Sequence, residues 1–167
     1  MGISKPKPLA REDDRAAFDC GKASLNDWFH NRAWKNQAAN VSRTNIVCDS
    51  ESGVIVGYVS LANTEIRRSL LTKEYQRNMP DPVPALLLGQ LAVDKNYQGQ
   101  GIASSLLFFA FKTALNVAIQ TGCFGLVTHP IDDNVREFYR QWGFQDNPFD
   151  PHGSMILRMS DLVESQW

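Results

Sequence analysis

Two glycines one residue apart, Gly99 and Gly101, stand between an apolar strand pattern and the longest helical pattern of the chain. Glycine adopts backbone angles that side chains forbid, and it lets a ligand approach the backbone closely. A loop of this kind exposes consecutive N–H groups at a helix N-terminus, which suits an anion and above all a phosphate. The small residues Ala103, Ser104 and Ser105 leave the first helical turn open. A plain turn into a helix is the simpler alternative.

Three phosphate-binding patterns differ in spacing, and the sequence separates them. The GxxxxGK[ST] loop of nucleotide hydrolases is absent. The run GQGIAS meets only the first two glycines of the dinucleotide fingerprint, because Ser104 stands at the third and the strand before it lies mid-chain. The pattern Gln/Arg-x-x-Gly-x-Gly/Ala is met in full. Its residues are Gln98, Gly99, Gln100, Gly101, Ile102 and Ala103.

Hydrophobic periodicity predicts the elements that hold this loop. The continuous apolar run 85–93 indicates a strand covered on both faces, and residues 102–121 repeat at helical spacing. Strands and helices alternate along the chain, which predicts a mixed α/β sheet with helices on its faces. The other expected elements are a helix at 25–38 with Ser24 as N-cap, a hairpin hinged at 50–53, a loop at 73–85, strands at 123–129 and 154–159, and a helix at 135–142 stopped by Gly143.

Length and composition narrow the class of protein. A chain of 167 residues that is 43% hydrophobic predicts one domain spanning residues 1–167. The three cysteines are scattered, so the sequence favours neither a disulfide framework nor a zinc site. We expect no signal peptide and no apolar run near the roughly 20 residues that a bilayer needs. The chain is therefore expected to be cytoplasmic, and its net charge of −1 argues against a uniformly basic nucleic-acid coat.

Two stretches together resemble the GNAT superfamily of N-acetyltransferases. LGQLAVDKNYQGQGIASSLL is similar to its central strand, loop and helix, and NVREFYRQWGF is similar to its later helix. The resemblance implies the GNAT fold, with a mostly antiparallel mixed sheet splayed at the site of acetyl-CoA and no metal. It also implies that a bulged strand pairs with pantetheine. The implied coenzyme contacts are Leu91, Ala92, Val93, Asn134 and Phe138, together with the loop from Gln98 to Ser104.

Acetyl transfer to an amine needs a neutral amine, donors for the oxyanion and a proton for the departing thiolate. The family places a tyrosine at the position of Tyr139 as the general acid. A phenol with a pKa near 10 is protonated at neutral pH and can donate as sulfur leaves. The backbone N–H of Val93 is the expected oxyanion donor. Packing in the core is the alternative role for Tyr139.

The expected central strand lacks a general base. Many relatives carry a glutamate there, but the run 85–93 offers only Gln90. An α-amine with a pKa near 7.7 to 8.0 is already partly neutral, whereas a lysine amine near 10.4 is not. The chemistry therefore favours an α-amine acceptor. Asp94 and Glu65 remain possible bases through water, although Asp94 is better placed to start a turn.

The N-terminal third is similar to a GNAT branch of toxins that acetylate the α-amine of aminoacyl-tRNA. The resemblance lies in FDCGKASLNDWFHNRAWKNQAANVSRTNIV. It implies a homodimer, no membrane association, a ribbon-helix-helix antitoxin as partner, and basic residues that receive aminoacyl-tRNA. These basic residues are Arg32, Lys35, Arg43, Arg67 and Arg68.

Two other functions stay open. One is a GNAT enzyme that acetylates a small-molecule amine or a protein N-terminus. The other is a non-catalytic module that keeps the fold and binds a partner. Cys20 and Trp28 are interpreted as packing residues, and His30 and His129 share no metal-ligand spacing.

Overall fold

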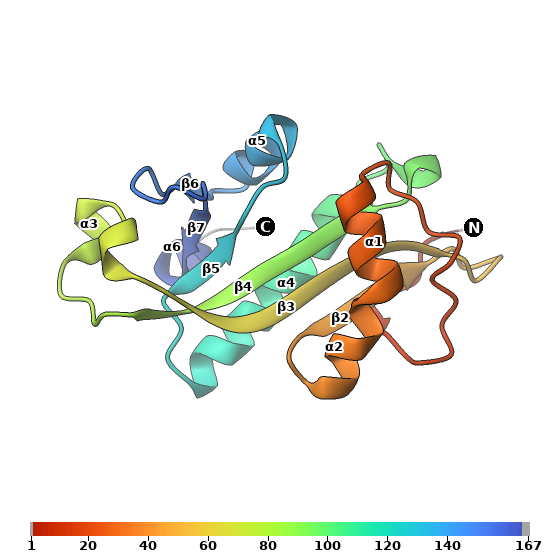
Figure 1. The fold of residues 1–167 in the computed structure, drawn as a ribbon, viewed down its shortest axis with the longest axis horizontal. Coiled ribbons are helices and arrows are strands. Elements are labelled where there is room, and N and C mark those ends of the chain that lie inside the picture. Colours follow the sequence, from red (N-terminus) through yellow and green to blue (C-terminus); the bar gives the residue numbers. More distant parts are fainter. Residues whose placement is uncertain (1, 165–167) are drawn as a thin grey trace. The chain divides into compact units, whose positions relative to one another are not determined.

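The computed structural model describes residues 2–164 (Figure 1). These residues divide into two compact units, one comprising residues 2–62 and 89–110 and the other residues 63–88 and 111–164. The strand order is β1-β2-β3-β4-β5-β7-β6, with both parallel and antiparallel pairs. The predicted mixed sheet is confirmed. The prediction of a single domain stays a prediction.

The first unit begins with a hairpin covered by two short helices. Strands β1 (Lys7–Pro8), β2 (Arg43–Cys48) and β3 (Ile55–Ile66) pair antiparallel. Helices α1 (Ala23–Asn31) and α2 (Ala33–Ala39) pack on this hairpin, where Phe29 and Ala33 meet Ile46 and Tyr58 in one buried cluster. Tyr58 stacks on Phe29 with ring centroids 4.3 Å apart, and its hydroxyl donates to the Leu25 carbonyl.

The opposite face of the same hairpin receives the start of the long helix α4 (Ile102–Gln120). A Cβ added to Gly57 would lie 3.0 Å from Leu106 and 3.1 Å from Val47, so the helix approaches the strand closely at this glycine. Strand β4 (Val83–Val93) leads through the 3-10 turn η2 (Lys95–Tyr97) into this helix. Within the first unit, helices therefore cover both faces of the sheet, as predicted.

The second unit is built around a short parallel ladder. Leu86–Leu88 of β4 pair with Leu126–Thr128 of β5 (Gly125–Thr128). Antiparallel pairs then add β7 (Met155–Arg158) and β6 (Gln145–Asp146). Its helices are η1 (Arg68–Leu70), α3 (Lys73–Gln76), α5 (Asp133–Gln141) and α6 (Met159–Glu164).

Three of the sequence predictions of secondary structure are wrong. The helix expected at 25–38 is two helices that meet at Arg32, which is the C-cap of the first and the N-cap of the second and has a φ of −119°. Ser24 lies inside α1, whose N-cap is Lys22, so the predicted N-cap is wrong. The region 73–85 contains α3 and the start of β4, so it is not simply a loop.

Helix α4 also corrects the expectation about apolar runs. It has 19 residues and a mean hydropathy of 1.7, which by length and composition alone would let it cross a membrane. Packing accounts for this composition. Leu106, Leu107, Ala110, Phe111 and Ala114 are each at most 1% exposed.

Candidate active site

The turn before residues 98–104, the loop predicted to bind the coenzyme and called the coenzyme loop below, is fixed by a buried carboxylate. Asp94 is 6% exposed, and its two oxygens accept the backbone N–H groups of Asn96 at 2.9 Å and Asp19 at 3.1 Å. Asp19 is held in turn by the N–H of Gly21 and by Lys95, and these contacts lower the pKa of Asp19 to about 2. Asp94 therefore starts a turn, as the sequence indicated.

Gln98 ties the coenzyme loop to the N-terminal segment. Its Nε2 donates to the carbonyl of Cys20 at 3.0 Å and to that of Val93 at 2.9 Å. An amide nitrogen has two hydrogens, and both are engaged in these bonds. The side chain of Gln98 therefore shapes the loop, and it has no hydrogen left to donate to a ligand.

The backbone of the coenzyme loop has the geometry that the glycine spacing predicted. Gly99 and Gly101 have φ angles of +80° and +81°, in the left-handed region that L side chains rarely adopt. In the described part of the chain, no acceptor takes the N–H groups of residues 99–104. Unpaired amides at a helix N-terminus form a preformed anion site. These residues fit the diphosphate of a coenzyme.

In the second unit, Tyr139 is a buried phenol among aromatic rings. It lies on α5, whose first turn is capped by the Asp132 carboxylate accepting from Val135 N–H at 2.9 Å. Tyr139 is 4% exposed, and its ring centroid lies 5.1 Å from that of Phe144. Burial raises the pKa of Tyr139 to about 12, against the opposing effect of a hydrogen bond with Thr128. The phenol is therefore fully protonated at neutral pH.

The family model for the acetyltransferase (GNAT) domain matches residues 42–146, a span that holds both the coenzyme loop and Tyr139. The chain belongs to the GNAT acetyltransferase family. The tRNA-acetylating toxin of Mycobacterium tuberculosis (strain ATCC 25618 / H37Rv) is 35% identical over 156 residues, which cover 93% of each chain. The probable toxin TacT of Sinorhizobium fredii (strain NBRC 101917 / NGR234) is 25% identical over 155 residues, or 87% of this chain and 83% of that one.

Two solved structures share the fold of this chain. AtaT complexed with acetyl-methionyl-tRNAfMet superposes with a TM-score of 0.88 at 23% identity, over 98% of both chains. AtaTR bound with AcCoA superposes with a TM-score of 0.84 at 23% identity, over 97% of this chain and 96% of that one. The GNAT fold predicted from the sequence is confirmed.

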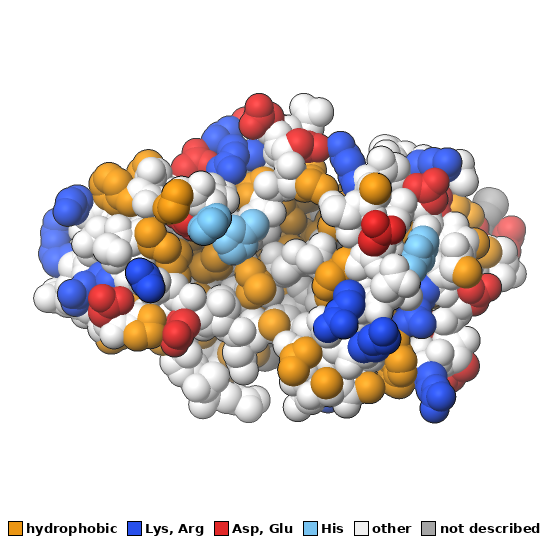
Figure 2. Space-filling model, viewed as in Figure 1, with side chains coloured by type: hydrophobic (Ala, Val, Ile, Leu, Met, Phe, Trp, Pro, Cys, Tyr) orange, Lys and Arg blue, Asp and Glu red, His pale blue; other side chains and the backbone are white. Residues whose placement is uncertain are grey.

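Several basic side chains of this GNAT chain lie on the two N-terminal helices and the strand after them. Arg32, Lys35 and Arg43 are exposed, and no carboxylate pairs with them within residues 2–164. Figure 2 shows Lys and Arg side chains gathered over the region of α1 and α2. Arg32 reaches only Asn36, at 3.5 Å. This surface is therefore locally positive on a chain whose net charge is −1.

Of the two basic residues predicted in the second unit, Arg68 is the one held by hydrogen bonds to a neighbouring segment. Arg67 and Arg68 are both exposed. Arg68 donates through Nη1 to the Met79 carbonyl at 2.9 Å, and its backbone N–H donates to Asp81 at 3.0 Å. These two hydrogen bonds join the segment that contains Arg68 to residues 79 and 81.

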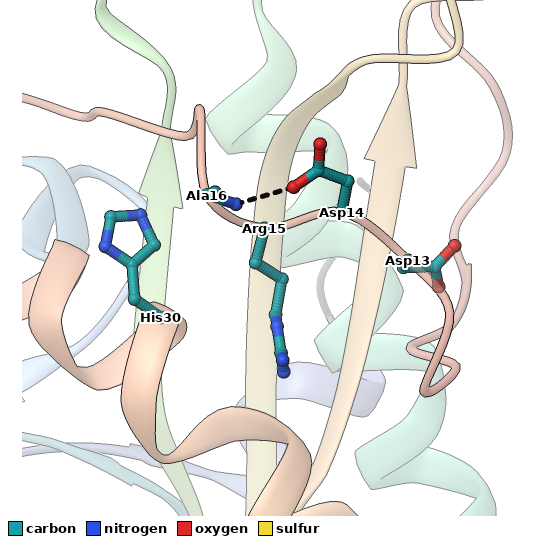
Figure 3. Close-up of a pocket in the computed structure, with 5 residues that line it drawn as sticks. All are labelled: Asp13, Asp14, Arg15, Ala16 and His30. Carbon is teal, nitrogen blue, oxygen red and sulfur yellow. Dashed lines mark hydrogen bonds between the residues drawn. The ribbon is translucent and has the colours of Figure 1, made fainter.

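A cavity of about 360 Å³ beside α1 contains a basic residue that the sequence analysis missed (Figure 3). Asp13 and Asp14 accept the backbone N–H groups of Ala10 and Ala16 and so close their own turns. In Figure 3 the Arg15 side chain extends away from both carboxylates. Its Nε is buried without a partner in the described chain. The fold places Arg15 beside His30 of α1, a position that the spacing of residues in the sequence did not reveal.

The remaining predicted residues lie as follows. Ala92 and Val93 are buried at the end of β4, Leu91 and Phe138 are partly exposed, and Asn134 is exposed in the first turn of α5. Cys20 is buried, and burial raises the pKa of its thiol, which fits the packing role. Among residues 2–164, no group of three His, Cys, Asp or Glu side chains is arranged to hold a metal ion.

Proposed function

We propose that this GNAT enzyme is a toxin that uses acetyl-CoA to acetylate the α-amine of aminoacyl-tRNA and thereby blocks translation. The observation that carries this proposal is the 35% identity to a tRNA-acetylating toxin over 93% of each chain. The geometry of the coenzyme loop and the burial of Tyr139 supply the chemistry that such a reaction needs.

Acetyl-CoA supplies the activated acetyl thioester. Its diphosphate is held by the unpaired amides of the coenzyme loop, from Gly99 to Ser104. The pantetheine arm runs along the end of β4 at Leu91, Ala92 and Val93, and Asn134 and Phe138 complete the coenzyme site. Gln98 acts through the shape of the loop.

The reaction is direct transfer. The amine nitrogen attacks the thioester carbonyl, a C–N bond forms, and the C–S bond breaks with its electron pair going to sulfur. The oxyanion that forms in between accepts a hydrogen bond from the Val93 N–H. Tyr139 gives its phenolic proton to the thiolate, and the proton that the nitrogen sheds restores the phenol.

The acceptor is an α-amine because the strand offers no base for a more basic amine. β4 carries no carboxylate, and the amide of Gln90 cannot take a proton at neutral pH. Asp94 is engaged by two backbone N–H groups and holds the turn. An α-amine is partly neutral without help.

The tRNA lies on the basic surface of the first unit, formed by Arg15, Arg32, Lys35 and Arg43. Arg67 and Arg68, in the second unit, are further candidate tRNA contacts. Each cation that neutralises a phosphate releases counterions, so binding weakens with salt. We further propose that the toxin is a cytoplasmic homodimer, and that a ribbon-helix-helix antitoxin blocks it.

The proposal is tested by incubating the protein with labelled acetyl-CoA and tRNA, charged in one reaction and uncharged in a second. We expect label only on charged tRNA. Transfer to small amines or peptide N-termini, without label on charged tRNA, would replace this proposal with the broader GNAT alternative. Coenzyme binding without transfer to any acceptor would favour the non-catalytic module.

A further inference from the structure

A second cavity, of about 350 Å³, adjoins the coenzyme loop within the first unit. Gln100 and Gly101 belong both to the loop and to the lining of this cavity. Its other walls are the N-terminal segment from Ile3 to Pro6, Val47 of β2 and the first turns of α4. The volume lies within the range of about 300 to 1,000 Å³ that is typical of small-molecule sites. A ligand whose diphosphate is held by the loop therefore lies at the edge of this cavity.

Hydrogen bonds to the end of β2 hold the N-terminal wall in place. The backbone N–H of Ser4 donates to the Cys48 carbonyl at 2.8 Å, and Ser4 Oγ accepts the Cys48 N–H at 2.9 Å. Ile3 pairs with Asp49 in an antiparallel bridge. The segment is therefore part of the sheet edge, and this wall of the cavity exists before any ligand arrives.

The described residues that line the cavity include one charged side chain, that of Lys5, and no acid. Lys5 is exposed, and no carboxylate pairs with it within residues 2–164. Ile3, Pro6 and Ile102 make other parts of the lining apolar, and the Ile3 side chain is 36% exposed. An ammonium group is a compact point charge that binds phosphate well. The cavity therefore suits a flat apolar group that carries an anion, as a purine nucleotide does.

We propose that this cavity binds the nucleotide end of acetyl-CoA, with the adenine against Ile3 and Pro6 and the ribose 3′-phosphate on Lys5. This inference rests on the proposed function, in which the coenzyme loop holds the diphosphate. In coenzyme A, one ribose joins the diphosphate, the 3′-phosphate and the adenine, so the last two groups lie one sugar away from the loop. The loop amides serve the diphosphate, and the 3′-phosphate needs a cation of its own, which Lys5 supplies.

The test of Lys5 uses calorimetry with coenzyme A and with 3′-dephospho-coenzyme A, which differ by this one phosphate. We expect the native protein to bind coenzyme A about fivefold more tightly, the scale of one partly exposed contact between charged groups. Lys5→Gln should bind the two ligands equally. Lys7→Gln is the matched control, because Lys7 is an exposed cation on β1 that does not line the cavity. It should keep the fivefold preference.

The two ligands also separate this inference from the proposed function. A preference for coenzyme A that survives in Lys5→Gln, or one that is absent from the native protein, would overturn the role of Lys5. An equal loss of affinity for both ligands in Lys5→Gln would overturn it as well. If folded native protein bound neither ligand, the proposed function itself would be contradicted.

Filling the cavity tests the place of the adenine. Ser105 is exposed, lines the cavity and lies on α4 just after the coenzyme loop. Ser105→Trp should weaken binding of 3′-dephospho-coenzyme A about tenfold, because the purine loses its apolar contacts. Ser105→Ala, which leaves the space open, should bind normally. Ser105→Phe is a smaller filling variant if the tryptophan variant does not fold. Unchanged affinity in a folded filling variant would overturn the placement of the adenine.

Discussion

The coenzyme loop and the surroundings of Tyr139 prepare for negative charge in opposite ways. The loop presents backbone amides that no acceptor takes within the described chain. Its shape is held by hydrogen bonds that the Gln98 amide donates and by those that the Asp94 carboxylate accepts. The Tyr139 side chain is buried among aromatic rings. The loop is built to meet a charge that is always present, whereas Tyr139 faces one that exists only during the reaction.

Because of this difference, variants of the loop and variants of Tyr139 should affect different quantities, coenzyme affinity in the first case and kcat in the second. Changes in the loop should alter the affinity for acetyl-CoA with little effect at saturation. Changes at Tyr139 should alter kcat and leave that affinity intact. Each variant below either breaks this separation or sharpens it.

The largest effect is expected from Tyr139→Phe. Loss of the general acid should lower kcat by about two orders of magnitude, because one positioned acid contributes on that scale. The ring still fills its place against Phe144, so stability and coenzyme affinity should stay near normal. Steady-state kinetics with charged tRNA, together with calorimetry for acetyl-CoA, measures both quantities. A matching loss of coenzyme affinity would break the separation.

Gly101→Val should weaken coenzyme binding and leave kcat unchanged, the opposite of Tyr139→Phe. A β-branched side chain at a φ of +81° strains the loop, and the Kd for acetyl-CoA should rise by roughly 10- to 30-fold with kcat at saturation preserved. Gly122→Ala is the matched control, because Gly122 has open space around it and no positive φ. Equal losses in the two variants would show that the loop geometry is not the cause.

Variants of the basic surface should weaken tRNA binding and leave the other measured quantities unchanged. Replacing Arg32 and Lys35 by glutamine should weaken binding of charged tRNA about tenfold at physiological salt and lower the salt slope by about 1.5. Coenzyme affinity should not change. Lys112→Gln, an exposed cation on α4, is the control. A slope that falls equally in the control would mean that total charge, and not this surface, attracts the RNA.

The smallest effect is expected from Gln98→Ala. Loss of the bonds to Cys20 and Val93 should loosen the loop and raise the Kd for acetyl-CoA by roughly three- to fivefold. Gln100→Ala removes the same type of side chain from the same loop, but this side chain makes no bond within residues 2–164. If Gln100→Ala had the larger effect, the role assigned to Gln98 would be wrong.

Local features of the chain were predictable because their causes are local. The spacing of Gly99 and Gly101 fixed the loop, and the apolar period fixed α4, whose observed bounds Ile102–Gln120 end one residue before the predicted 121. Ser24 failed as an N-cap because the helix starts at Ala23, two residues before the predicted start at 25. Short elements such as α3 and β6 depend on packing and carry no clear period.

The contacts that tune the site were not predictable. Gln98 bonds a carbonyl 78 residues away, and Thr128 bonds one 40 residues away. Spacing within a motif does not reveal such partners. The sequence therefore pointed to Gln98 as a coenzyme contact, and only the fold gives its side chain a different role.

The most direct test of the account is the position of the acetyl group on the product. Charged tRNA is incubated with acetyl-CoA and the protein and then digested by nuclease, and the aminoacyl-adenosine is measured by mass spectrometry. We predict that its mass rises by one acetyl group, with the modification on the α-amine, and that Tyr139→Phe slows this about a hundredfold. An unmodified aminoacyl-adenosine, formed with folded protein that binds acetyl-CoA, would contradict the account.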